Sequence, residues 1–210
     1  MSFSFSELAA CRPFAFHVCG LVNFHSIQRS RRLRSARALL TGTPCEHLLA
    51  GRRLKTERVS AFGVDVEVRD HRPLIAGSLS FPDGYGIDQF VAELNSRVFL
   101  WAGTDAGPVR SGRNHIARYS AEGEVRLLRV PTDALLRANV GPMTSVTFCN
   151  SGAARHNKGL PAQRGPGTFV DPREANRPAS EVVELTFVDE VVLPPGTVYA
   201  SSLNGDWATL

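Results

Sequence analysis

The sequence predicts an α+β fold in a single domain that spans residues 1–210. Short apolar or alternating stretches, which are typical of strands, recur along the chain, and the expected helices gather in its early part. No regular alternation of strand and helix is present, so a parallel sheet built from βαβ units is not expected. With 210 residues, 43% of them hydrophobic, the chain can bury the core of one domain.

The beginning of the chain predicts short helices around one buried strand. Ser6 is a suitable cap for a helix that ends before Pro13, because the residue that precedes a proline is pushed out of helical geometry. Residues 14–19 then form an apolar run typical of a buried strand. Asn23 and Ser35 are the expected caps of two further helices.

The middle of the chain contains two regular patterns. Residues 64–68 alternate valine with acidic residues, a period of two that predicts a half-buried strand. Residues 87–94 carry apolar side chains at i, i+3, i+4 and i+7, which predicts an amphipathic helix. Residues 98–101 are apolar and predict a short strand.

The last part of the chain predicts more strands and one long loop. A helix capped at Thr132 is expected between two of these strands. Residues 150–180 are rich in Gly, Pro, Arg and Asn, and a loop of this length inside a domain is usually functional or disordered. The expected strands are residues 125–130, 143–148, 181–187 and 191–193.

Several common chemistries lack their motifs. The sequence contains no G-x-x-x-x-G-K-[ST], no G-x-G-x-x-G after a strand, no G-x-S-x-G and no H-E-x-x-H. Phosphate-loop NTPases, Rossmann dehydrogenases, α/β-hydrolases and zinc peptidases of the usual kinds are therefore not expected.

The four cysteines predict neither a metal site nor a disulfide framework, because no Cys-x-x-Cys pair or regular spacing is present. We expect reduced thiols that serve in packing. Cys149 with a histidine as base is the alternative, a cysteine hydrolase, although nothing near it in the sequence favours that chemistry.

Membrane insertion and secretion are not expected. No apolar run approaches the roughly 20 residues that a membrane-spanning helix needs. Glu7 interrupts the apolar start, and no basic segment precedes it. The sequence therefore predicts a cytoplasmic protein without a membrane partner.

Arginine dominates the positive charge. The net charge is +4, and 22 of the 24 basic residues are arginine, a bias that either serves phosphate binding or reflects the composition of the genome. One cluster is dense enough to predict phosphate contacts; it consists of Arg29, Arg31, Arg32, Arg34 and Arg37.

A histidine lies inside the apolar strand expected at residues 14–19. His17 precedes a turn at Gly20 and the helix expected at Asn23, and a core histidine bonded to a carbonyl is the alternative to a binding role. This segment resembles the first strand and helix of the ADP-ribosyltransferase superfamily, especially DarT-like enzymes and the related RNA 2′-phosphotransferases. Cys19 replaces the usual threonine and Phe24 the usual leucine. The resemblance implies that His17, Cys19 and Asn23 contact NAD.

Residues 180–187 resemble the late strand in which this superfamily carries its catalytic glutamate. Glu181 would share a strand face with Val183 and Leu185, whereas Glu184 would lie on the other face. An acid on the more apolar face needs a functional reason, since burial of an unpaired carboxylate is costly. We therefore expect Glu181 to be catalytic. A one-residue bulge would favour Glu184, and pairing with Arg173 or Arg177 at a frayed strand end is the structural alternative.

Two further segments resemble parts of the superfamily. Residues 94–101 are similar to its central strand, which implies that Phe99 and Trp101 flank the nicotinamide, although a core role suits both equally. Residues 68–74 resemble an Arg-Asp-x-x-Pro segment of an uncharacterised bacterial branch. Arg53 and Arg69 are the expected contacts of the NAD diphosphate, with Arg52 and Arg58 as rivals for that role.

The resemblance implies an antiparallel split β-sheet core with peripheral helices and an NAD-dependent ADP-ribosyltransferase activity. NAD would be the co-substrate, Glu181 and His17 the catalytic residues, and no metal would be needed. DNA or RNA is the expected acceptor, as in a toxin or defence enzyme, and an antitoxin would then be a partner. The first alternative is a non-catalytic member of the fold that binds nucleic acid or protein through its arginine-rich loop. The second is an RNA 2′-phosphotransferase, which would need a convergent set of arginines.

Overall fold

The structure, a computed structural model, describes residues 2–139, 144–154 and 159–210. Within these residues the α-helices are α1 (Phe5–Cys11), α2 (Leu21–Ser30), α3 (Ala36–Leu40), α4 (Ile87–Asn95), α5 (Arg110–Glu122) and α6 (Thr132–Ala138). The strands are β1 (Phe14–Gly20), β2 (Arg32–Arg34), β3 (Glu57–Ala61), β4 (Val64–Val68), β5 (Leu79–Ser80), β6 (Arg97–Thr104), β7 (Gly107–Pro108), β8 (Val125–Pro131), β9 (Thr144–Thr147), β10 (Ala162–Gln163), β11 (Glu184–Val188), β12 (Glu190–Val192), β13 (Val198–Ala200) and β14 (Ala208–Thr209). Short 3-10 turns are η1 (Glu46–Leu49), η2 (Ala76–Ser78), η3 (Pro166–Thr168), η4 (Pro172–Glu174) and η5 (Ala179–Glu181).

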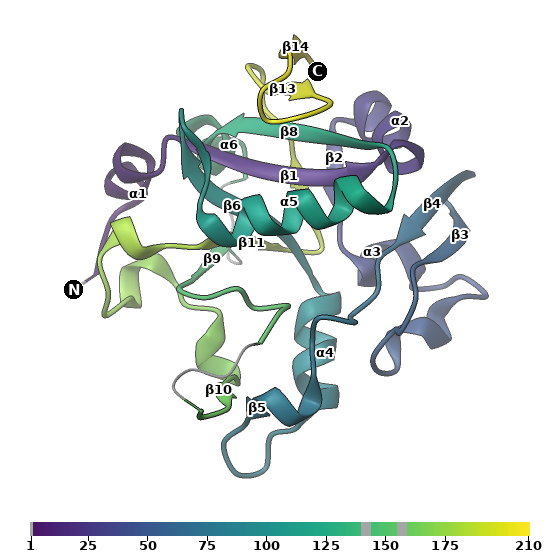
Figure 1. Cartoon of the computed structure of the whole chain (residues 1–210), viewed down its shortest axis with the longest axis vertical. Coiled ribbons are helices and arrows are strands. Elements are labelled where there is room, and N and C mark those ends of the chain that lie inside the picture. The colour runs from purple at the N-terminus through teal and green to yellow at the C-terminus, as the bar shows by residue number, and fades with distance from the viewer. Residues whose placement is uncertain (1, 140–143, 155–158) are drawn as a thin grey trace.

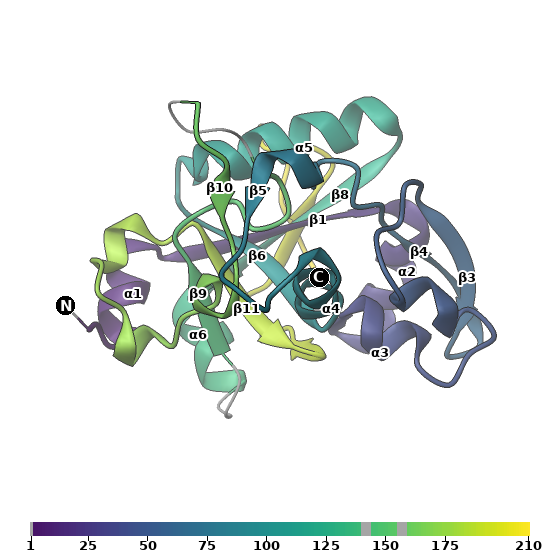
Figure 2. The ribbon, with the colours of Figure 1, turned by 90° about the horizontal axis from the view of Figure 1, so that it is seen from below.

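A central antiparallel sheet positions the helices. Its strands lie in the order β14, β13, β8, β1, β6, β11 and β9, and β7 pairs with β6. The sheet lies between α5 on one side and α6 on the other (Figure 1, Figure 2). The α+β class predicted from the sequence is therefore confirmed.

Both faces of the sheet are covered by apolar side chains. On the larger side, Phe24 of α2 and Leu135 of α6 belong to one core with Leu128 and Leu185 of the strands. On the other side, Val18, Val125 and Leu127 pack against Ile116 of α5. A central strand such as β11 is consequently buried on both faces, and all of its residues from Glu184 to Phe187 are buried.

The pairing of β1 with β6 stops halfway along β1. These strands pair at Phe14, Ala15 and Phe16, which face Gly103, Ala102 and Trp101. Beyond that point β1 continues beside β8 as far as Gly20, and β6 continues beside β11 as far as Arg97. The two halves of the sheet therefore part between His17 and the middle of β6.

Smaller units pack around this opening. The β3–β4 hairpin lies beside α2 and α3 (Figure 1) and shares a small core with Leu40 of α3. On another side, Phe90, Val91 and Leu94 of α4 form a separate apolar cluster with Leu74. The segments between these units, residues 69–75 above all, connect the hairpin to α4 across the opening.

Most predicted elements are confirmed. The strands at 14–19, 64–68 and 125–130 are β1, β4 and β8, and the predicted helices at 87–94 and after Ser35 are α4 and α3. The predicted strand at 143–148 is β9; Met143 lies outside the described residues.

Five details of the predictions are wrong. Thr132 is the first residue of α6, whose N-cap is Pro131. Ser4 rather than Ser6 caps α1, because Ser4 and Glu7 form a reciprocal capping box. Asn23 lies inside α2, whose N-cap is Gly20. The strand predicted at 181–187 begins only at Glu184. Helix α5 was not predicted, since few of its residues are apolar.

Candidate functional site

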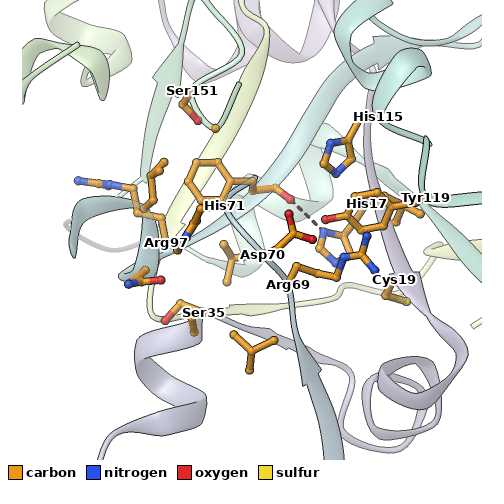
Figure 3. Close-up of a pocket in the computed structure, with 18 of the residues that line it drawn as sticks. His17, Cys19, Ser35, Arg69, Asp70, His71, Arg97, His115, Tyr119 and Ser151 are labelled. Carbon is orange, nitrogen blue, oxygen red and sulfur yellow. Dashed lines mark hydrogen bonds between the residues drawn. The ribbon is translucent and has the colours of Figure 1, made fainter. Parts of the chain in front are cut away.

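A pocket opens where β1 and β6 part. Its volume is about 270 Å³, and its walls come from β1, α2, the segment after β4, α4, β6, α5, the segment after β9, and β11. His17, Trp101 and Glu184 all line it, each from a different strand of the central sheet. Figure 3 shows how the labelled side chains, His17 and His115 among them, converge on this space.

His17 lies at the point where the sheet divides. Its Nδ1 atom is 3.0 Å from the carbonyl oxygen of Phe99, a bond that crosses the gap between β1 and β6 (Figure 3). Because a carbonyl can only accept, Nδ1 carries the proton of the neutral ring and Nε2 remains an acceptor. Burial lowers the pKa of His17 and so favours the neutral form, although the Phe99 carbonyl opposes the effect. His17 thus offers a ligand a hydrogen-bond acceptor.

Glu184 is the buried carboxyl group of the pocket. It faces Trp101 on one neighbouring strand and Thr147 on the other, and it is only 2% exposed. Its Oε2 atom lies 2.9 Å from the Thr147 hydroxyl and 3.3 Å from the backbone nitrogen of Ser151. Burial raises the pKa of Glu184 to about 7; the Ser151 and Thr147 groups and the charge of Arg164 oppose this rise.

Glu181 is not in the pocket. It ends the turn η5 and its side chain, 47% exposed, forms an ion pair with Arg177, so the prediction that it lies on an apolar strand face is wrong. The reason is that the two faces of β11 are both buried, and the more polar face, with Glu184 and Thr186, is the one turned to the pocket side. Alternation therefore could not identify the functional face. Arg177, four residues before Glu181, was the signal of a helical turn rather than a strand.

A ladder of rings forms one wall of the pocket. The ring of Trp101 lies 5.4 Å from that of His115, which lies 4.3 Å from that of Tyr119. The guanidinium of Arg69 covers Tyr119 at 3.7 Å, which extends the ladder from the sheet toward the segment after β4 (Figure 3). Burial, followed by the charges of nearby basic groups, lowers the pKa of His115 to about 4. The wall is therefore uncharged except at its Arg69 end.

Phe99 contributes differently from Trp101. Both line the pocket, but the ring of Phe99 also packs against Phe169 at 6.2 Å. Its carbonyl oxygen, rather than its ring, makes the contact with His17. Trp101 is 6% exposed and packs closely on Gly112 of α5.

The two arginines expected to contact the diphosphate differ in how many of their guanidinium N–H groups are already bonded within the protein. Arg53 is 7% exposed, and its guanidinium donates to the carbonyls of Leu48 and Arg69 and approaches His71. Arg69 has one guanidinium contact with Glu122, while its Nε atom has no hydrogen-bond partner among the described residues. Arg69 is therefore the better of the two for an anionic ligand. The rival Arg58 pairs with Asp65, and Arg52 does not line the pocket.

Cys19 and Asn23 line the pocket but serve its construction. Cys19 is 4% exposed, belongs to the main core, and burial raises the pKa of its thiol to about 12. The side-chain amide of Asn23 bonds both backbone groups of Glu67, at 2.7 and 2.8 Å. Asn23 thereby ties the β3–β4 hairpin to α2, and neither side chain has a free polar group directed to a ligand.

The pocket residues that the sequence reasoning missed include Asp70, His115, Tyr119 and Ser151. The Asp70 side chain is 2% exposed. Burial alone would raise the pKa of Asp70, but the hydrogen bonds and charges of Arg72 and Arg118 outweigh it and lower the pKa to about 2. The spacing of His115 and Tyr119, four residues apart, could have identified one face of a helix. No comparable signal marked Ser151.

The arginine cluster expected to bind phosphate is engaged within the protein. Arg32 and Arg34 pair with Glu190, and Arg37 pairs with Asp189. Arg31 donates to the carbonyls of Pro194 and Leu210. In the predicted functional loop, Arg173 pairs with Asp171 and Arg177 with Glu181. These charges are paired with acids or carbonyls of the same chain; Arg155 and Lys158 lie outside the described residues.

Other site types are also not apparent in the part of the chain that the structure describes. Within it no group of three or more His, Cys, Asp or Glu side chains could hold a metal ion. All four cysteines are free thiols. Burial raises the pKa of the Cys149 thiol, which does not favour a thiolate nucleophile. No helix of the described residues is long and apolar enough to cross a membrane.

The comparisons with known proteins identify the family. Residues 13–195 match a family of unknown function, DUF7002, and the chain belongs to this family. No curated protein matches the chain, and no solved structure matches it.

Proposed function

We propose that this member of DUF7002 cleaves the bond between nicotinamide and ribose in NAD and transfers ADP-ribose, with Glu184 as the catalytic carboxylate. One observation carries the proposal. Three neighbouring strands, β1, β6 and β11, bring His17, Trp101 and Glu184 to one pocket at the point where the sheet divides. These are the strands that the resemblance to ADP-ribosyltransferases singles out. Their arrangement also supports an ADP-ribosyltransferase-like fold with a split antiparallel sheet.

The pocket suits the nicotinamide end of NAD. The ring ladder that begins at Trp101 gives a flat, largely uncharged surface for a heteroaromatic ring. The Glu184 carboxyl, in register with Trp101, faces the positive charge of that ring from the sheet. The acceptor Nε2 of His17 suits a ribose hydroxyl or the carboxamide N–H.

The remaining half of NAD needs room beyond this pocket. A second cavity of about 250 Å³ adjoins the first, and both are lined by Gly20, Glu67, Arg69 and Tyr119. A diphosphate at this junction would meet Arg69, whose Nε has no partner among the described residues. Two cavities of similar size on either side of a basic residue support a ligand made of two nucleosides joined by a diphosphate.

The chemistry requires charge rather than a metal. Cleavage of the glycosidic bond passes through an oxocarbenium-like transition state, in which positive charge moves from the nicotinamide to the ribose. An ionised Glu184 beside that ribose stabilises the developing cation, and it can also take the proton of the acceptor. Thr147 and Ser151 hold the carboxyl group in place.

The acceptor of the ADP-ribose is a separate question from the site of cleavage. The arginine cluster near β2 was one reason to expect DNA or RNA, and three of its five arginines, Arg32, Arg34 and Arg37, are paired with acids of the chain. Nucleic acid, protein and water therefore enter the test as separate arms. The arginines that line the pocket are also engaged, as in the pairs Arg97–Glu93 and Arg118–Asp70, which does not favour an RNA 2′-phosphotransferase.

The experiment is release of nicotinamide from NAD by the purified protein, alone and with RNA, single-stranded DNA or protein. Glu184→Gln is nearly isosteric and should reduce release by about 10²- to 10³-fold, the usual cost of one preorganised electrostatic contact. Glu181→Gln, three residues away and exposed, is the matched control and should retain activity. Wild-type protein that binds NAD without cleaving it would favour the non-catalytic binding module. Loss of activity in Glu181→Gln with full activity in Glu184→Gln would refute the assignment of Glu184.

A further inference from the structure

The hydroxyl group of Thr147 has two acceptors but only one proton. Its oxygen lies 2.7 Å from the carbonyl oxygen of Cys149 and 2.9 Å from Oε2 of Glu184. A carbonyl oxygen can only accept, so the shorter contact requires the Thr147 proton. The contact with Glu184 is then a hydrogen bond only if its proton belongs to Glu184. The opposite assignment would leave two oxygens 2.7 Å apart without a proton between them.

The surroundings of Glu184 contain no ion pair for a carboxylate among the described residues. Arg164 lies near enough to act on it electrostatically, but the guanidinium of Arg164 donates to the carbonyls of Asn150 and Gln163. Burial keeps His17 on β1, His115 on α5 and the Cys149 thiol beside β9 in their neutral forms. The charged groups Arg97 and Arg118, which also line the pocket, pair with Glu93 and Asp70. A buried carboxyl group without a cationic partner favours its protonated form.

We propose that Glu184 carries a proton until a ring with a permanent positive charge binds, and that this exchange selects N-substituted pyridinium rings over their uncharged dihydro forms. The inference rests on the proposed function and goes beyond it, since it defines the charge of the ligand that the pocket accepts. The balance is simple. The O–H bond of Glu184 breaks, its proton passes to the solvent, and the positive charge of the ring replaces that of the proton.

Two groups of Ser151, its hydroxyl and its backbone N–H, are positioned to stabilise the ionised form. Ser151 is 1% exposed, and its hydroxyl oxygen makes no hydrogen bond within the described residues, but it lies near enough to Glu184 to lower the pKa of that carboxyl group. A buried hydroxyl without a partner is costly, and an ionised Glu184 would provide an acceptor for it. The backbone N–H of Ser151, whose nitrogen lies 3.3 Å from Oε2 of Glu184, can donate to the same carboxylate. Ser151 is therefore a positioning residue whose contribution appears when Glu184 loses its proton.

The test uses carba-NAD, in which a carbocycle replaces the nicotinamide ribose and prevents cleavage, and its reduced dihydro form. Binding is measured by calorimetry between pH 5 and 9, with two buffers of different ionisation enthalpy. Binding of carba-NAD should release roughly nine-tenths of a proton from the protein at pH 6 and almost none at pH 9. The affinity for carba-NAD should rise about tenfold with each pH unit below pH 7. The reduced form should show neither effect.

Three variants sharpen the test. Glu184→Gln should abolish proton release, and Ser151→Ala should move the pH dependence of affinity to higher pH. Glu181→Gln should match the wild type. In the ligand-free protein, ¹³C NMR of labelled glutamate should give a titration midpoint near 7 for one carboxyl group, absent in Glu184→Gln.

The outcomes separate this inference from the proposed function. Binding of carba-NAD without proton release by a protein that cleaves NAD, or a Glu184 midpoint below about 5, near that of an ordinary glutamate, overturns the inference and leaves the function intact. Absence of binding by both nucleotides overturns both. Equal pH dependence for the oxidised and reduced forms shows that ring charge is not what Glu184 senses, and this too overturns the inference.

Discussion

Two regions of the protein contain an unusual set of polar residues in the sequence. In the structure they differ in how far these polar groups are paired. At the surface between β2 and β12, each of Arg32, Arg34 and Arg37 finds an acid from near the other end of the chain. In the pocket between β1 and β6, the polar groups are buried with fewer partners than they can use. The Ser151 hydroxyl and Arg69 Nε have none among the described residues, and Glu184 has no ion pair there.

The difference shows which kind of polar residue marks a functional site. Exposed ion pairs contribute little to stability and leave little capacity for a ligand. A buried polar group without a partner costs free energy in the folded protein, so it persists where another molecule can satisfy it. Density of charge pointed to a surface where three of the arginines are already paired, and incomplete hydrogen bonding points to the pocket.

The largest effect of a binding contact should come from His17. His17→Asn can still donate to the Phe99 carbonyl from nearly the position of Nδ1 but lacks the acceptor at Nε2. We expect folding to survive and NAD affinity to fall about 10- to 100-fold, as expected for the loss of a buried hydrogen bond that leaves a ligand group unpaired. His17→Gln, which places an amide nearer Nε2, should recover part of the affinity. Normal NAD binding by His17→Asn would show that His17 is only a structural link across the split sheet.

The second effect is on stability, and here the substitution of a pocket residue, Glu184→Gln, should be favourable. The pKa of Glu184 rises from 4.5 to about 7 on folding. The folded protein therefore holds a proton that the unfolded chain releases, and wild-type stability should fall as pH rises through this window and stay constant above it. Glu184→Gln does not titrate, so it should be more stable than wild type by about 2–4 kcal/mol at pH 8 but similar at pH 4. Urea denaturation at both pH values measures this.

The control for that measurement is again Glu181→Gln. The Glu181 side chain lies outside the pocket and is 47% exposed, so this variant keeps Glu184 and its stability should show the pH dependence of the wild type. A Glu184→Gln variant that is less stable than wild type at pH 8 would mean that the folded protein stabilises the Glu184 carboxylate. The pocket would then resemble the arginine surface, where the charged groups are paired.

The third effect concerns the support of the ring ladder. A Cβ atom at Gly112 would lie 2.7 Å from Cγ of Trp101 and 2.8 Å from Cβ of Pro108. Gly112→Ala should therefore displace Trp101, cost about 1–3 kcal/mol in free energy of unfolding and weaken NAD binding. Gly77→Ala is the matched control, since nothing lies within 4 Å of a Cβ atom there. Equal stability of the two variants would show that α5 can move without loss.

Local patterns predicted much of the fold. The alternation at 64–68 and the helical spacing at 87–94 are properties of single segments, and both elements form where expected. Helix α5 has no such signal. Only Gly112 and Ile116 are buried in it, because its inner face consists largely of rings and small residues around the pocket.

The site was predicted in part. His17 and Trp101 lie in the pocket, because the resemblance rests on strands that the fold keeps together. Glu184 was only the alternative to Glu181, because strand alternation separates a buried face from an exposed one, whereas β11 has two buried faces. Asp70, far from both strands in sequence, reaches the pocket only because the segment after β4 crosses the opening. Sequence spacing contains no information on such a crossing.

The smallest effect should come from the arginine surface. Arg32→Ala, Arg34→Ala and Arg37→Ala each remove a partly exposed ion pair, which is worth less than about 1 kcal/mol. If the cluster contacted phosphates, each substitution would lower the salt dependence of nucleic-acid binding by about one unit of slope. Since Arg32 and Arg34 share Glu190 and Arg37 pairs with Asp189, we expect each substitution to change the slope of log affinity against log salt by clearly less than one unit. Arg29→Ala, in the same cluster but with no ion pair among the described residues, is the informative comparison. The opposite result is a slope that falls as much in the Arg32, Arg34 and Arg37 variants as in Arg29→Ala. That result would mean that nucleic acid displaces Glu190 and Asp189 and binds arginines that are paired in the free protein.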